Sequence, residues 1–119
     1  MELSIYARAK QNVQDLKERL IELCLQNKFG GWSYKNFSIE EEAIFKTIEG
    51  EDKYRIIAFI IEENDNSLTL TPAKVKGEKG LLFKQFINCF GDIVNLLIEN
   101  AWDSIEAIWI HNKYEDYNT

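Results

Sequence analysis

The sequence contains few of the residues that metal sites and disulfide bonds require. Its 119 residues include one histidine, His111, and two cysteines, Cys24 and Cys89. Both cysteines fall within or beside apolar helical faces, where a thiol stays protonated and reacts slowly. The N-terminal segment has no apolar run of the kind found in a signal peptide. We therefore expect two reduced core cysteines and a cytoplasmic location.

Long apolar runs and an excess of basic residues are also absent. No stretch approaches the about 18 uninterrupted apolar residues of a transmembrane helix, so we expect no membrane association. Lys and Arg number 14 against 20 Asp and Glu, which gives a net charge of −6. Nucleic acids and anionic membrane surfaces attract clustered Lys and Arg, so this charge balance disfavours both as partners. It is compatible with a protein partner that has a basic surface.

The common catalytic and nucleotide-binding motifs are missing as well. There is no Rossmann glycine motif, P-loop, HExxH, GxSxG or EF-hand loop. His111 has no other metal ligands at coordinated spacing, which predicts a structural or solvent-facing role. A cysteine–histidine pair stays open, because such residues meet in space rather than in sequence. We predict no metal, no cofactor and no enzymatic activity.

The chain is instead rich in apolar residues, at 45% hydrophobic and 13% aromatic, which predicts one folded domain over residues 1–119. Its most apolar stretch, residues 81–101, predicts a helix with an apolar arc of roughly 200°, twice that of an ordinary surface helix. Such a helix is either deeply buried or offers a second apolar flank for self-association. We expect the C-terminal strand and tail, or else a second copy of the chain, to cover this flank, and we favour the former. The flank consists of Leu82, Cys89, Ile93 and Leu96.

Hydrophobic periodicity predicts an α+β fold in the order α-β-β-β-β-α-β. The expected sheet is an antiparallel meander with both helices on one face and a C-terminal strand added. One strand is apolar on both faces from Ile56 to Ile61, which is typical of the middle of a sheet. The last segment is either a strand or a short helix, and its isoleucines and tryptophan favour a strand. The predicted helices are 5–27 and 81–101, and the predicted strands are 32–39, 43–49, 53–62, 68–73 and 104–112.

Acidic residues follow two turns that a meander places at the same end of the sheet. They predict either ordinary solvated turns or an acidic rim that steers a basic protein partner. Aromatic residues near the chain end, Trp109, Tyr114 and Tyr117, are candidate anchors for the same partner. The rim candidates are Glu40, Glu41, Glu42, Glu62, Glu63 and Asp65.

The loop 74–80 places Lys74, Lys76 and Lys79 directly before the second helix, where a helix N-terminus favours anions. A solvated connection is the simpler interpretation. Three hypotheses follow. The first is an acidic protein-binding module of inhibitor, immunity or anti-defence type. The second is a self-associating chaperone or adaptor domain. The third is a small anion-binding protein or enzyme that uses the lysine loop.

Overall fold

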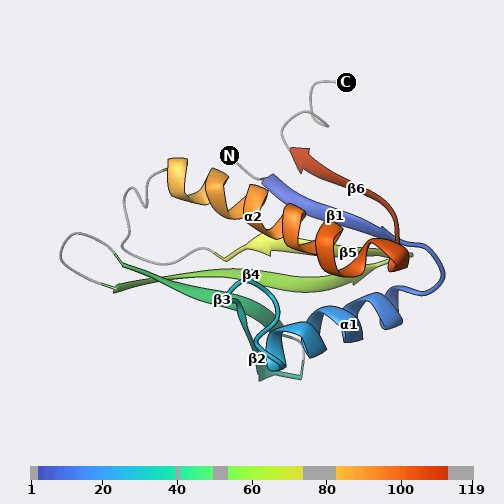
Figure 1. The fold of residues 1–119 in the computed structure, drawn as a ribbon, viewed down its shortest axis with the longest axis horizontal. Helices are drawn as coiled ribbons and strands as arrows, with labels where there is room; N and C mark the ends of the chain where they lie inside the picture. The colour runs from blue at the N-terminus through green and yellow to red at the C-terminus, as the bar shows by residue number, and fades with distance from the viewer. Residues whose placement is uncertain (1–2, 40, 50–53, 74–82, 113–119) are drawn as a thin grey trace.

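Six strands form one antiparallel sheet, and two helices pack against the same face of it in this computed structural model (Figure 1). The structure describes residues 3–39, 41–49, 54–73 and 83–112. The predicted α+β class is confirmed. The elements are β1 (Leu3–Ala9), α1 (Val13–Leu25), β2 (Ser33–Ser38), β3 (Glu41–Glu49), β4 (Tyr54–Asn64), β5 (Ser67–Pro72), α2 (Phe83–Ala101), the 3-10 helix η1 (Trp102–Ser104) and β6 (Ile105–Asn112).

The strand order in the sheet is β2-β3-β4-β5-β1-β6. Strands β2 to β5 form the predicted meander, because each pairs with the next along the chain. Strand β1 then pairs with β5, and β6 pairs with β1. The C-terminal segment is a strand, as predicted, and it joins the sheet through the N-terminal strand rather than through the meander. The two edges of the sheet are therefore β2 and β6.

The prediction of a single N-terminal helix over residues 5–27 is wrong at its start. Residues 3–9 form β1, and the helix begins at Val13. The side chain of Asn12 caps it by accepting a hydrogen bond from the backbone N–H of Gln14 at 2.8 Å. Hydrogen bonding to strands on both sides selects the extended conformation for β1, and propensity along the chain does not reveal such partners.

The core lies between one face of the sheet and the two helices. Helix α1 contributes Leu16, Leu20 and Cys24, which are buried. The ring of Phe90 on α2 meets the ring of Phe59 on β4 edge-on, with centroids 5.3 Å apart. The connection between α1 and β2 adds the fully buried Phe29 and Trp32, so a segment without regular structure completes the core.

The apolar flank proposed for self-association belongs to this core. Cys89 and Ile93 are buried, and Leu96 packs against the core beside Gly30. Leu82 lies outside the described residues. The flank is occupied because α2 contacts the sheet beneath it and also the turn after α1 beside it. The wide apolar arc of α2 therefore mainly reflects burial on two sides within one chain.

Arg19 of α1 fixes the place where α2 ends and β6 begins. Its guanidinium donates hydrogen bonds to Asp103 Oδ1 at 2.7 Å, to Ser104 Oγ at 2.9 Å and to the carbonyl oxygen of Asn100 at 2.6 Å. A cation at a helix C-terminus also interacts favourably with the helix dipole. Neither helix, over its described residues, is long and apolar enough to cross a membrane.

Candidate functional site

The sheet face opposite α1 and α2, which we call the open face, is not covered by any described helix. Side chains alternate between the two faces of a strand, and residues paired across strands share a face. Ile60 pairs with Ala43 on one side and with Thr71 on the other, and Ser4 pairs with His111. The hydroxyl oxygens of Ser4 and Thr71 lie 3.1 Å apart and connect these two groups. The open face therefore runs continuously from β3 to β6.

The middle of the β3–β4 half of the open face is apolar. Its cross-strand pairs are Ala43 with Ile60 and Phe45 with Ala58. Ile56 is 55% exposed, although its neighbour Ile57 is buried in the core. The predicted two-sided apolar strand is thus an interior strand, between β3 and β5, but one of its faces is open. Strands that are apolar on both faces normally have both faces covered.

The β1–β6 half carries a group of stacked side chains. Tyr6 and Trp109 are cross-strand partners whose ring centroids lie 5.5 Å apart with an interplanar angle of 22°. The ring of His111 meets that of Tyr6 at 5.3 Å, and the Arg8 guanidinium carbon lies 5.4 Å from the centroid of the Trp109 ring. Aromatic and cation–π contacts of this kind hold large side chains in place at the surface.

Thr69 on β5 lies between the two halves, paired with Glu62 on one side and with Tyr6 on the other. The residue is only 6% exposed, and its Oγ1 has no hydrogen-bond partner in the part of the chain that the structure describes. A buried hydroxyl without a partner is unfavourable by about 1–3 kcal/mol. The centre of the open face therefore holds an unused donor and acceptor.

The predicted rim residues gather at one end of the sheet. Glu41 and Glu42 begin β3, while Glu62 and Glu63 lie near the end of β4, and antiparallel pairing brings these ends together. Asp65 follows in the turn between β4 and β5, in the left-handed region with φ of 55°. Glu40 lies outside the described residues.

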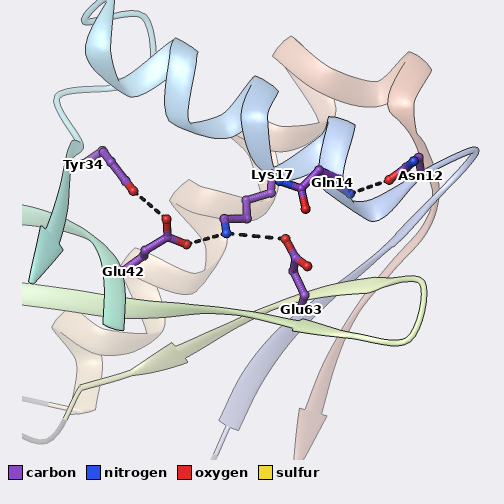
Figure 2. A network of polar contacts seen from close by, with 6 residues as sticks. All are labelled: Asn12, Gln14, Lys17, Tyr34, Glu42 and Glu63. Atoms are coloured by element: carbon purple, nitrogen blue, oxygen red, sulfur yellow. Dashed lines mark hydrogen bonds and ion pairs between the residues drawn. The ribbon is translucent and has the colours of Figure 1, made fainter. Parts of the chain in front are cut away.

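Two of these glutamates are used within the protein, in a network on the helix side of the sheet (Figure 2). The Nζ of Lys17 on α1 lies 2.5 Å from Glu42 Oε2 and 3.4 Å from Glu63 Oε1. The Tyr34 hydroxyl donates to Glu42 Oε1 at 2.8 Å. The exposed carboxylates that stay available to a partner are those of Glu41, Glu62 and Asp65.

The network changes the ionisation of its members. Burial alone would raise the pKa of Glu42, but the hydrogen bonds from Lys17 and Tyr34 and the charge of Lys17 outweigh it, so the pKa is lowered. The hydrogen bond to Glu42 is the largest effect on Lys17, and its pKa is raised. Both charged forms are therefore stabilised in the folded state.

The cysteines and the histidine do not form a catalytic pair. Cys24 and Cys89 are buried on the helix side of the sheet, whereas His111 lies on the open face. Burial raises the pKa of the Cys24 thiol to about 12. Burial, followed by the charge of Asp92, also raises the pKa of Cys89. No group of three or more potential metal ligands occurs among the described residues.

Several predicted site residues cannot be placed. Tyr114 and Tyr117 lie outside the described residues, as do Lys74, Lys76 and Lys79 of the lysine loop. Trp109 lies on the open face. Sequence reasoning missed Tyr6 and Arg8 because it assigned them to a helix. The alternation of Ile5, Ala7 and Ala9 with polar and aromatic residues was the signal that could have found them.

The sequence matches no protein-family model and no curated protein. The geometry of the open face and the rim therefore carries the functional proposal.

Proposed function

We propose that this protein is a non-enzymatic protein-binding module that docks a partner protein on its open face. The observation that carries the proposal is the second apolar face of β4. Ile56 is 55% exposed there, with Phe45, Ala58 and Ile60 partly exposed beside it. Contiguous apolar side chains on a surface are typical of protein-interaction sites.

The exposed carboxylates select the chemistry of the partner. Glu62 lies on the open face as the cross-strand neighbour of Thr69, and Glu41 is exposed at the adjacent start of β3. Together with the net charge of −6, they favour a partner with basic residues opposite this end of the sheet. Arg8 and Lys35 lie nearer the two edges of the sheet, so the complementary surface is basic opposite Glu41 and Glu62 rather than throughout.

The aromatic half of the open face supplies anchorage for the same partner. Tyr and Trp lose little conformational entropy on binding, and Tyr6 and Trp109 already support each other through stacking. A small inhibitor or immunity-type protein acts in this manner, because it occupies a surface that its partner needs. The proposed role as an inhibitor rests on the apolar, aromatic and acidic side chains of the open face, which suit the covering of a partner's surface.

Photo-cross-linking identifies the partner and locates its docking surface together. A photoreactive residue at the exposed Thr47, which pairs with Ile56 on the open face, is compared with one at the exposed Glu18 of α1. We expect one protein to be captured from Thr47 and not from Glu18. Equal capture from both positions contradicts docking on the open face.

The Kd of the purified partner then tests whether the carboxylates of Glu41 and Glu62 contribute to binding. The double variant Glu41→Lys, Glu62→Lys is expected to weaken binding by at least about tenfold at low salt, and by less at high salt. The matched control, Glu18→Lys with Glu99→Lys, makes the same change in net charge on exposed helix positions. Equal weakening by the control pair contradicts a specific role for the rim.

A further inference from the structure

Glu62 and Thr69 are cross-strand neighbours on the open face, and neither side chain has a polar partner among the described residues. Thr69 is only 6% exposed, and its Oγ1 makes no hydrogen bond within that part of the chain. The Glu62 carboxylate is exposed and makes no ion pair there. A hydroxyl group and a carboxylate that are both available at one place can bind a ligand that donates hydrogen bonds.

A second carboxylate adds negative charge at this place. Glu42 pairs with Ile61, so the antiparallel register brings the preceding Glu41 opposite Glu62 on the open face. Like charges that face each other across two strands are destabilising. A bound cation would relieve this repulsion. No group of three or more potential metal ligands occurs in the described ranges, which favours an organic cation over a metal ion.

Tyr6 borders the same place from the other side, as the cross-strand partner of Thr69. Its ring stacks on that of Trp109 and also contacts His111, and both of these residues lie on β6. The second face of the Tyr6 ring is therefore turned toward β5. The guanidinium of Arg8 lies over Trp109, so this cation is engaged elsewhere. An aromatic face attracts a cation, and a planar guanidinium stacks on it.

We propose that Glu62, Thr69 and Tyr6, which we call the Thr69 site, bind an arginine side chain of the partner protein. The guanidinium stacks on the second face of Tyr6, donates to the Glu62 carboxylate and gives Thr69 Oγ1 the donor that it lacks. Arginine suits these groups better than lysine because its planar fork of donors can stack and donate at once. The inference rests on the proposed function and names the residue type that the open face selects in the partner.

Binding of the arginine requires one local movement. Thr69 Oγ1 is closed to water in the free protein, so a neighbouring side chain must turn aside before a donor reaches it. Glu62 is exposed, and its side chain can change rotamer while the strand stays in place. The unpaired hydroxyl is unfavourable in the free protein, and the bound guanidinium relieves it. Binding therefore gains a hydrogen bond that the free fold lacks.

An NMR titration with N-acetyl-arginine amide tests the Thr69 site without the partner. We expect chemical-shift changes centred on the amide and methyl groups of Thr69 at millimolar concentrations of the probe. N-acetyl-lysine amide is expected to bind at least about threefold more weakly, because its ammonium group neither stacks nor forks. Shift changes that are scattered over the surface, or equal binding of the two probes, overturn the inference.

Thr69→Val tests the hydroxyl, because it keeps the shape of the side chain. We expect it to weaken binding of N-acetyl-arginine amide by at least about threefold and to raise the melting temperature, since a buried unpaired hydroxyl is removed. A threonine with a purely structural role does not predict the loss of binding. The matched control, Thr47→Val, removes an exposed hydroxyl elsewhere on the open face and is expected to leave binding of the probe unchanged.

Glu62→Gln tests the charge in the same titration. It is expected to weaken binding of the arginine probe by at least about fivefold, whereas Glu99→Gln on the exposed surface of α2 has no effect. In the complex, Thr69→Val is expected to raise the Kd of the cross-linked partner by at least about threefold, and to have no effect once the critical arginine of the partner is replaced. A partner that loses affinity for Ile56→Lys but not for Thr69→Val overturns this inference and leaves docking on the open face intact.

Discussion

The ring of Trp109 on the edge strand β6 stacks on the ring of Tyr6 on β1, with centroids 5.5 Å apart. This contact joins residues from the two ends of the sequence. It predicts that Tyr6 and Trp109 stabilise the fold as a pair. In a double-mutant cycle of Tyr6→Ala and Trp109→Ala, we expect a coupling of about 0.5–1.5 kcal/mol in the free energy of unfolding. Additive effects of the two substitutions in urea unfolding contradict the stacking.

Substitution by alanine is predicted to have opposite effects at Gly30, in the turn after α1, and at Gly91, in α2. At Gly30, φ is +58° and an added Cβ would lie 2.7 Å from Leu96 Cδ1. Gly30→Ala is therefore expected to destabilise the fold by about 1–3 kcal/mol. Gly91 of α2 is exposed and has open space around it, so Gly91→Ala is expected to stabilise by about 0.5–1 kcal/mol. Chemical denaturation measures both, and equal changes in the same direction contradict this account.

The Lys17 network predicts a stability that depends on pH. The pKa of Glu42 is lowered on folding, so its contribution is present above the unfolded-state pKa and is lost as pH falls through the folded-state pKa. The pKa of Lys17 is raised, so its contribution is present below the unfolded value of 10.5 and is lost as pH rises through the folded value. The full contribution therefore spans the range between these two limits.

The substitution Glu42→Gln isolates the acid limb of this dependence. At pH 7 we expect it to lower the free energy of unfolding by about 1–2 kcal/mol, because Lys17 and Tyr34 each lose a charged acceptor. The difference from wild type should shrink as pH falls below the unfolded-state value of 4.5 and through the lower folded-state pKa, where the carboxyl group of the wild type becomes protonated. Glu18→Gln on the exposed surface of α1 is the control. A difference that is constant from pH 3 to pH 7 is inconsistent with the network.

The buried thiols predict slow modification of the native protein. Burial raises the pKa of Cys24 to about 12 and also raises that of Cys89, so little thiolate forms at pH 8. We expect both to react with a disulfide reagent at least about 100-fold more slowly than in the unfolded chain. Stopped-flow absorbance in buffer and in denaturant gives both rates. Rapid reaction of either thiol in the native state contradicts its burial.

Most of the fold follows from hydrophobic patterns in the sequence, and the exceptions have physical causes. The four meander strands and β6 could be predicted because alternation and turn residues are local. Strand β1 was missed, because Ile5 and Ala9 are four residues apart, a spacing that suits both a strand and a helix, and the alternation through Ala7 is short. The burial pattern of Ile5, Ala7 and Ala9 distinguishes the two, and it depends on the neighbouring strands β5 and β6.

The candidate site was less predictable for a similar reason. The sequence indicated that acidic residues gather at one end of the sheet, but the use of Glu42 and Glu63 by Lys17 depends on where α1 docks. It indicated that β4 is apolar on both faces. Which face stays open depends on the packing of both helices against the same side of the sheet. Coverage of a surface is a property of the tertiary structure.

The affinity of the partner for the single variant Ile56→Lys tests whether the partner docks on the open face. Ile56 is 55% exposed and lies on the open face, so the substitution should preserve the fold. Isothermal titration calorimetry gives the Kd of the partner identified by cross-linking. Ile110→Lys is the matched control, because Ile110 is 48% exposed and lies on the helix side of the sheet, paired with the buried Ile5. Docking on the open face predicts that Ile56→Lys raises this Kd at least about 30-fold, whereas Ile110→Lys leaves it unchanged. An unchanged Kd for Ile56→Lys, in a variant with wild-type thermal stability, contradicts docking on the open face.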